Sequence, residues 1–283
     1  MTSVARTRAE LSAIRSDWAA SGESVAVVMT MGALHAGHAE LIRQARTRDE
    51  RVIVTDFLNP LQFAPGEDLD KYPRTFAADL ELCSSESVDL LFAPGPSEVY
   101  PEGDPIVRVA AGPVGDVLEG EARPGHFDGV LTVVAKLLHL TAPHRAYFGQ
   151  KDAQQLWLIT RMVRDLDIPV DVVEVATVRD ADGLALSSRN IYLVEADRAD
   201  ALALHEALEA GTAAAAMGPR AVVSAAEARL AESGVKADYV SLVDPEGFTV
   251  LDQPGTALLL VAAHVGSTRL IDNVRLNVGA HQE

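Results

Sequence analysis

Residues 24–48 read SVAVVMTMGALHAGHAELIRQARTR, which is a strand pattern, a short loop and a helix pattern in direct succession. The apolar, β-branched run at 24–30 predicts a buried strand, and the apolar spacing at 39–48 predicts a helix. A strand that leads at once into a helix is the building unit of parallel α/β sheets. This stretch therefore places the first part of the chain in the α/β class.

The same alternation of strands and helices continues to residue 175 and then stops. Further strands are predicted at residues 51–57, 89–93, 146–148 and 170–175, and further helices at 76–84, 126–140 and 153–166. Beyond residue 177, alanine-rich helical stretches at 195–216 and 219–232 precede strand patterns at 238–243, 257–263 and 268–273. We therefore expect two domains, a parallel-sheet domain over residues 1–177 and a smaller α+β domain over residues 178–283.

Composition and charge narrow the class of protein. Hydrophobic residues make up 48% of the 283, and the single cysteine, Cys83, excludes an internal disulfide framework and a cysteine-rich zinc site. Residues 1–21 lack the core of a signal peptide, and no run reaches the ~18 apolar residues of a membrane span. We therefore expect a cytoplasmic protein.

The formal net charge of −17 bears on the partners of the protein. It disfavours nucleic acid and anionic membranes, and it also repels ATP. Any anionic substrate must therefore meet a local cluster of lysine, arginine and histidine side chains.

The motif His35-Ala-Gly-His38 lies between the first predicted strand and its helix. A helix N-terminus offers unpaired N–H groups and a partial positive charge, so it suits a phosphate. Gly37 lets the backbone come close, and two imidazoles three residues apart can donate hydrogen bonds to charge that develops on an α-phosphate. The alternative is a pair of ordinary surface or metal-binding histidines.

A second candidate site is the loop Ala185-Leu-Ser-Ser-Arg-Asn190 at the expected domain junction. Arginine offers a fork of donors and serine a rotatable one, so Ser187, Ser188 and Arg189 fit a phosphate clamp. A solvated turn is the plainer interpretation.

A third candidate, Phe148-Gly-Gln-Lys-Asp-Ala-Gln-Gln155, combines a strand end, a turn and a helix start. Ligands of open α/β sheets gather at the carboxyl ends of strands, where Lys151 can reach phosphate and Asp152 or Gln155 can bind hydroxyl groups. Asp152 can equally serve only to cap the helix.

The fourth candidate, Phe57-Leu-Asn-Pro-Leu-Gln-Phe63, also follows a strand. Asn59 and Gln62 carry neutral donors for a carboxylate or a hydroxyl, although Asn59 and Pro60 can equally serve only to shape a turn. Arg123-Pro-Gly-His-Phe127 adds an arginine and a histidine in another loop. Taken together, these loops outline a cleft.

These stretches resemble the pantothenate synthetase family of H-x-G-H nucleotidylyltransferases. The resemblance covers nearly the whole chain, and its most specific part is Asp68-Leu-Asp-Lys-Tyr-Pro-Arg-Thr75. The other matching stretches are residues 30–38, 57–63, 123–127, 148–156 and 177–193.

The resemblance implies a Rossmann-like N-terminal domain that binds ATP and pantoate, and a C-terminal domain that closes over them. Pantoate would attack the α-phosphate of Mg²⁺-bound ATP, and β-alanine would then attack the pantoyl-adenylate to give pantothenate and AMP. The family also implies a homodimer through the N-terminal domain. We expect no metal ligands of the protein's own, and no nucleic acid or membrane partner.

The resemblance also assigns roles to individual residues. The catalytic set would be His35 and His38 at the α-phosphate, with Lys151, Ser187, Ser188 and Arg189 on the triphosphate. Further ATP contacts would come from Thr30, Met31, Gly32, Gly37, Gly149, Asp152 and Val178. The acid would be bound by Phe57, Asn59, Gln62, Val133, Val134 and Gln155.

Several positions depart from the family pattern, namely Met29, Asp56, Ala78, Gln150 and Ala153. They keep open two alternatives, a related ligase for a different acid or amine and a nucleotide-binding protein with little turnover. The pattern does not decide which way Asp56 faces, because a shift of one residue in strand register reverses it.

Overall fold

The computed structural model describes residues 2–64 and 66–279. The chain divides into two compact units, which we call unit 1 (Met1–Gly149 with Leu158–Ala176) and unit 2 (Gln150–Trp157 with Thr177–Glu283). Each unit has its own sheet and its own hydrophobic core.

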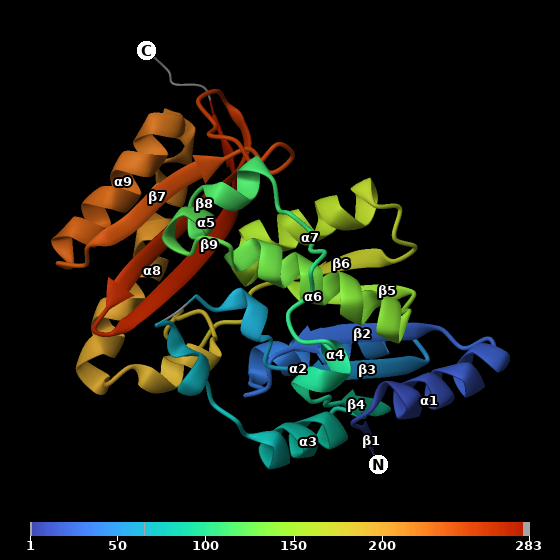
Figure 1. The fold of residues 1–283 in the computed structure, drawn as a ribbon. Coiled ribbons are helices and arrows are strands. Elements are labelled where there is room, and N and C mark those ends of the chain that lie inside the picture. Colours follow the sequence, from blue (N-terminus) through green and yellow to red (C-terminus); the bar gives the residue numbers. More distant parts are fainter. Residues whose placement is uncertain (1, 65, 280–283) are drawn as a thin grey trace. The chain divides into compact units, whose positions relative to one another are not determined.

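Unit 1 is built on a parallel sheet that has six strands within the described residues (Figure 1). They are β1 (Ser3–Ala5), β2 (Val25–Thr30), β3 (Arg51–Asp56), β4 (Leu90–Phe92), β5 (Arg145–Gly149) and β6 (Asp171–Val175). Their order is β1-β4-β3-β2-β5-β6, with parallel pairing throughout. The direction of winding changes between β2 and β5, and ligands of open α/β sheets bind at such a point. The predicted α/β class is confirmed.

Helices cover both faces of this sheet. The helical segments are α1 (Arg8–Ala20), α2 (Ala36–Arg46), α3 (Phe76–Ser85), α4 (Pro96–Val99), α5 (Glu119–Ala122), α6 (His126–Thr141) and α7 (Ala153–Asp165), whose start belongs to unit 2. Ala26 and Val28 of β2 pack with Ile42 of α2 and Cys83 of α3. Val27 points to the opposite face and is also fully buried, so neither face is open to water.

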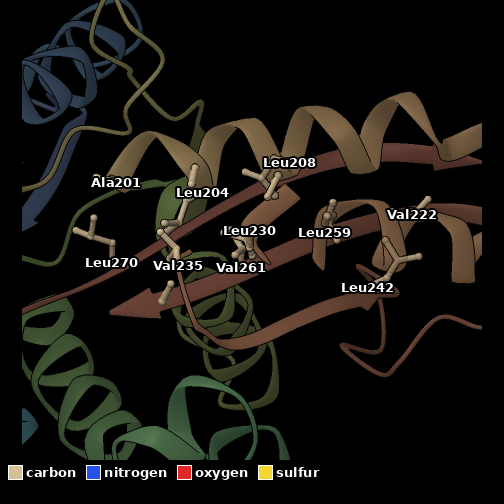
Figure 2. Packing of buried hydrophobic residues seen from close by; sticks show 14 of the residues in the cluster. Ala201, Leu204, Leu208, Val222, Leu230, Val235, Leu242, Leu259, Val261 and Leu270 are labelled. Atoms are coloured by element: carbon tan, nitrogen blue, oxygen red, sulfur yellow. The ribbon is translucent and has the colours of Figure 1, made fainter. Parts of the chain in front are cut away.

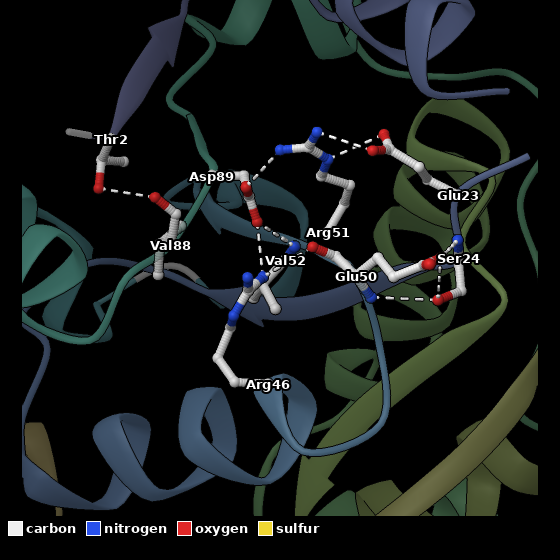
Figure 3. Close-up of polar contacts among 9 residues, drawn as sticks. All are labelled: Thr2, Glu23, Ser24, Arg46, Glu50, Arg51, Val52, Val88 and Asp89. Carbon is white, nitrogen blue, oxygen red and sulfur yellow. Dashed lines mark hydrogen bonds and ion pairs between the residues drawn. The ribbon is translucent and has the colours of Figure 1, made fainter. Parts of the chain in front are cut away.

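Ion pairs join the amino ends of the strands, away from the strand ends that carry the histidines. Figure 3 shows the Asp89 carboxylate between the Arg46 and Arg51 guanidinium groups. Arg46 Nη1 lies 2.6 Å from Asp89 Oδ2, and Arg51 Nη1 lies 2.9 Å from Asp89 Oδ1. Asp89 also accepts the Val52 N–H, and Arg51 forms two bonds to Glu23. These contacts fix the register of β3 beside β4 and leave the carboxyl ends of the strands available for a site.

Within the described part of the chain, unit 2 is a three-stranded antiparallel sheet packed against two helices. Its elements are α8 (Glu195–Ala213), α9 (Pro219–Glu232), β7 (Ala237–Val243), β8 (Gly255–Val265) and β9 (Thr268–Val278). Figure 2 shows the core, in which Leu204 and Leu208 of α8 face Leu259 and Val261 of β8. The predicted smaller α+β C-terminal domain is confirmed as a fold class.

The structure adds elements that the apolar pattern does not predict. The first helix, α1, buries only Leu11, so it carries almost no apolar stripe. Its start is nevertheless encoded, because Thr7 and Glu10 form a capping box. Helix α2 begins at Ala36, three residues before the predicted start, because His35 caps it. In the described ranges, every helix is too short or too polar to pass through a bilayer.

Candidate active site

The segment from Met31 to His38, here called the histidine loop, follows β2 and adopts an unusual backbone. Gly32 and Ala33 both have positive φ, at 82° and 52°. A non-glycine residue in this region costs ~1–2 kcal/mol, so the surroundings must hold Ala33 in place. Thr30 contributes, because its hydroxyl donates to the Thr55 carbonyl at 2.7 Å and accepts the Gly32 N–H at 3.2 Å.

The buried carboxylate of Asp79, on α3, supplies the remaining support. Its two oxygens accept the backbone N–H groups of Ala33 at 3.0 Å and of Leu34 at 2.7 Å, and the Thr75 hydroxyl donates to both oxygens. Asp79 is 1% exposed, so these are charge-assisted bonds shielded from water. The strained part of the histidine loop is thus fixed by one buried negative charge.

The two histidine rings contact each other at the start of α2, with their centroids 4.1 Å apart and their planes tilted by 47°. His35 Nδ1 accepts the Gly37 N–H at 3.1 Å, and His38 Nδ1 accepts the His35 N–H at 3.2 Å. In the neutral rings the proton therefore resides on Nε2. Each ring is a fixed N–H donor at a helix N-terminus, an arrangement that suits a phosphoryl oxygen.

Asp56, whose orientation the pattern leaves open, faces the histidine loop. A Cβ built on Gly32 would lie 2.6 Å from Asp56 Oδ1, so the carboxyl packs directly against this glycine. Burial, with a further contribution from the nearby Asp79, raises the pKa of Asp56 to about 6. The side chain is therefore held where its charge is disfavoured.

After β3, Asn59 to Gln62 form a second structured segment, here called the amide turn. Asn59 is 1% exposed and uses its whole amide: Nδ2 donates to Gln62 Oε1 and to the Gly129 carbonyl, and Oδ1 accepts the Tyr100 hydroxyl. Gln62 Nε2 in turn donates to Met31 Sδ at 3.0 Å, so the amide turn touches the histidine loop. Asn59 orients Gln62, and direct contact of Asn59 with a ligand would require these bonds to open.

Helix α6 fits closely against the amide turn. A Cβ built on Gly129 would lie 2.2 Å from the Leu61 carbonyl oxygen, so only glycine permits this approach. Val133 and Val134 follow on the same helix and are buried, as is Phe57 at the end of β3. Phe57, Val133 and Val134 are thus buried apolar residues on, or directly after, the two elements that adjoin the amide turn.

Arg123 and His126 secure the far end of the amide turn. Burial, together with the adjacent Arg123 charge, lowers the pKa of His126 to about 4, so its ring is neutral at pH 7. His126 Nδ1 lies 2.8 Å from the Gln62 carbonyl and Nε2 lies 3.0 Å from Arg123. Nδ1 therefore donates and Nε2 accepts, and Arg123 also pairs with Glu67. The Arg-Pro-Gly-His motif shapes the turn that carries Gln62.

The remaining predicted site residues lie at the end of β5 or within unit 2. Gly149 ends β5, and Lys151 and Asp152 follow in the 3₁₀ turn η4 (Gln150–Asp152), here called the lysine turn. Gln155 is half-buried in the first turns of α7.

The serine loop, residues 187–189, consists of Ser187 and the first two residues of the 3₁₀ turn η5 (Ser188–Tyr192). Ser187 caps η5 by accepting the Arg189 N–H at 3.2 Å. The preceding hairpin is closed by a bond from the Leu186 N–H to the Val178 carbonyl. Val178 therefore contributes backbone structure to this loop.

The chain also matches known proteins along its length. A family model described as pantoate-beta-alanine ligase matches residues 3–275. The chain belongs to the pantoate-beta-alanine ligase family. A pantothenate synthetase of Salinispora arenicola is 54% identical over 99% of this chain and 100% of its own length, and pantothenate synthetase 4 of Frankia alni is 58% identical over 89% and 82%.

Solved structures of pantoate-beta-alanine ligases agree with the fold. The pantothenate synthetase of Thermus thermophilus superposes with a TM-score of 0.91 at 45% identity, covering 96% of this chain and 99% of its own. A pantoate-beta-alanine ligase of Francisella tularensis, solved with beta-gamma ATP and beta-alanine, gives 0.82 at 33% identity and covers 97% of both chains.

Sequence reasoning missed four residues that support the histidine loop or the amide turn: Asp79, Tyr100, Gly129 and His126 as a support for Gln62. Asp79 lies in helix α3 and Tyr100 directly follows α4, and their partners are 45 and 41 residues away, so no local signal marks them. Gly129 was detectable, because a glycine inside a predicted helix indicates close packing or function.

Proposed function

We propose that this chain is an ATP-dependent ligase that joins pantoate to β-alanine through a pantoyl-adenylate, with release of pyrophosphate and AMP. The observation that carries the proposal is the pair of Nε2–H donors at the start of α2, fixed by backbone N–H groups on Nδ1. Full-length similarity to the pantoate-beta-alanine ligase family supports the choice of substrates.

In this mechanism the pantoate carboxylate attacks the α-phosphorus of ATP, and the P–O bond to pyrophosphate breaks. His35 and His38 donate hydrogen bonds to the α-phosphoryl oxygens as negative charge accumulates there. Fixed donors of this kind lower the activation barrier by ~3–4 kcal/mol in other enzymes. The amine of β-alanine then attacks the acyl carbon, and AMP leaves with the electron pair of the broken C–O bond.

The histidine loop and the amide turn are held by different contacts, which fits separate roles in binding ATP and the acid. We assign ATP to the histidine loop with Thr30 and Gly37, and to Gly149, Lys151, Asp152, Val178 and the serine loop. We assign the acid to the amide turn through Gln62, with Phe57, Val133, Val134 and Gln155 around it. Asn59 acts on the acid through Gln62. Mg²⁺ enters with ATP as part of the substrate.

We further propose a homodimer through unit 1, in the cytoplasm. The dimer is supported by the family resemblance, and the compartment by the single cysteine, Cys83, which is buried and unpaired with any other. Sedimentation at micromolar concentration tests the dimer, and a monomer would contradict it.

The function is tested by measuring pyrophosphate and AMP release across a small matrix of acids and amines. We expect turnover with pantoate and β-alanine, and pantothenate as the product. Turnover only with another pair would assign the chain to a related ligase. Absence of AMP with every pair would leave a nucleotide-binding protein.

A further inference from the structure

Strand β9, coloured red in Figure 1, buries two adjacent polar residues, and one face of this strand contributes leucines to the core of unit 2. Asp272 and Asn273 are 4% and 8% exposed. Leu270 and Leu276 belong to the core cluster, so alternation places Asp272 on their face and Asn273 on the opposite face. Buried polar groups need partners, and the partners of these two identify a role.

Asn273 binds the lysine turn. Its Nδ2 donates to the carbonyl oxygens of Gln150 and Lys151, both at 2.9 Å. Both donor hydrogens of one amide are therefore used on two consecutive carbonyl groups. This bond pair fixes the backbone from which the Lys151 side chain projects.

Asp272 binds the hairpin that leads to the serine loop. Its carboxylate pairs with both terminal nitrogens of Arg179, at 2.5 and 2.9 Å. Arg179 also donates to the Gly183 carbonyl at 3.1 Å and to the Asn273 carbonyl at 3.4 Å. The hairpin is thus attached to β9 at the residue next to Asn273.

We propose that Asn273 is a positioning residue that holds the lysine turn in register with the serine loop, whose hairpin Asp272 anchors to the same strand. Two segments that are distant in sequence then present Lys151 and Arg189 to one ligand from a shared support. The inference rests on the assignment of both segments to the triphosphate. It deepens that assignment by naming what sets their spacing.

The test compares three variants of the full chain by steady-state kinetics with ATP and pantoate varied separately. In Asn273→Ala both bonds to the lysine turn are lost. We expect the KM for ATP to rise ~10-fold while the KM for pantoate stays within ~2-fold, because two hydrogen bonds on one side of the site are removed. Lys151→Ala reports the effect of losing the positioned group itself. Asn277→Ala is the matched control, because Asn277 lies four residues along on the same face, is exposed, and accepts a bond from the Thr256 hydroxyl of the neighbouring strand.

Asn273→Asp separates positioning from simple stability. The shape is kept, but an ionised carboxylate opposes two carbonyl oxygens, so we expect a KM for ATP at pH 8 at least as high as in Asn273→Ala. Protonation restores one donor, so the KM should fall toward the wild-type value as the pH is lowered. Loss of stability alone would not reverse with pH in this way, and thermal unfolding of each variant verifies that it is folded at the assay temperature.

The outcomes distinguish the inference from the proposal on which it rests. If Lys151→Ala raises the KM for ATP and Asn273→Ala leaves it at the wild-type value, the positioning role is wrong and the lysine assignment stands. If Lys151→Ala itself has no effect, the triphosphate assignment fails, and the positioning role fails with it.

Discussion

The histidine loop follows β2 and the amide turn follows β3, yet different forces hold these neighbouring segments of unit 1. The histidine loop is fixed by charge, because Asp79 accepts two of its backbone N–H groups from a buried position. The amide turn is fixed by shape and by neutral amides, because α6 approaches it at Gly129 and Asn59 bonds to Gln62.

Because of this difference, mutations in the two segments should change the kinetic constants for ATP and for the acid separately. A change of charge at constant volume should disturb the histidine loop and the use of ATP. A change of volume without charge should disturb the amide turn and the use of the acid. Single substitutions in each segment can break that separation.

The largest effect is expected at His38, where capping and catalysis can be separated. In His38→Asn the side-chain oxygen replaces Nδ1 as the acceptor of the His35 N–H, but the donor at Nε2 is lost. We expect kcat to fall ~10²–10³-fold, as for other lost transition-state donors, with little change in the melting temperature. His38→Gln, which places an N–H near the Nε2 position, should retain more activity.

Stopped assays of AMP release measure both variants, and His139→Ala, at an exposed position of α6, serves as the control. Near wild-type turnover in His38→Asn would remove the His38 donor from the mechanism.

The next effect is expected from Gly129→Ala, which adds volume without charge. The new methyl would lie 2.2 Å from the Leu61 carbonyl oxygen, so the amide turn must move. A misplacement of ~1 Å costs ~10²-fold in catalytic efficiency in other enzymes. We expect the loss here to appear in kcat/KM for pantoate. Gly95→Ala is the matched control, because a Cβ there meets nothing within 4 Å. A KM for ATP that rises as much as the KM for pantoate would end the separation of the two segments.

Asp79→Asn makes the opposite change, removing charge at nearly constant volume. The amide keeps one acceptor, and its NH₂ group must face the N–H of Ala33 or Leu34. We expect a loss of ~1–3 kcal/mol in the free energy of unfolding, as for a broken buried hydrogen bond to a charged group. The KM for ATP should rise, while the KM for pantoate should change less. Chemical denaturation and separate titrations of each substrate measure these quantities, and wild-type values in both would show that the charge is dispensable.

The smallest effect is expected from Asp56→Asn, and it should depend on pH. Burial raises the pKa of Asp56 from its ordinary 3.8 to about 6, so the folded state binds its proton more tightly than the unfolded state. The wild-type protein therefore gains stability from this group below pH 3.8 and loses it as the pH rises through about 6. Asp56→Asn should melt at a higher temperature than the wild type at pH 7.5, and the advantage should shrink by pH 4.5. An equal difference at both pH values would show that burial of the Asp56 charge is not the cause.

How much of this could be predicted from the sequence depends on the distance over which each feature is encoded. Short runs of apolar and β-branched residues located most strands of both sheets, because buried strands form apolar stretches that can be recognised along the chain. The start of α1 was encoded in Thr7 and Glu10, but the nearly absent apolar stripe concealed the helix. The roles of His35 and His38 as helix caps were also within reach, since they follow from the strand, loop and helix order.

The supports of the site could not be predicted in the same way. Asp79 meets Ala33 across 46 residues, and Asn273 meets Lys151 across 122. Such contacts depend on strand order and register, which no local pattern in a single sequence specifies. Sequence thus indicated candidate groups for the chemistry, whereas what holds them became visible only in the folded chain.

The buried thiol of Cys83, on α3, can report how often unit 1 opens. The thiol is fully buried against the sheet of unit 1, and burial, with the nearby Asp79 and Asp56 charges, raises its pKa to about 12. It is the single cysteine of the chain, so an alkylating reagent has one target and meets it only in molecules whose sheet has opened. The rate of labelling would then count the opening events of unit 1, and adding ATP or the acid would show which substrate slows them.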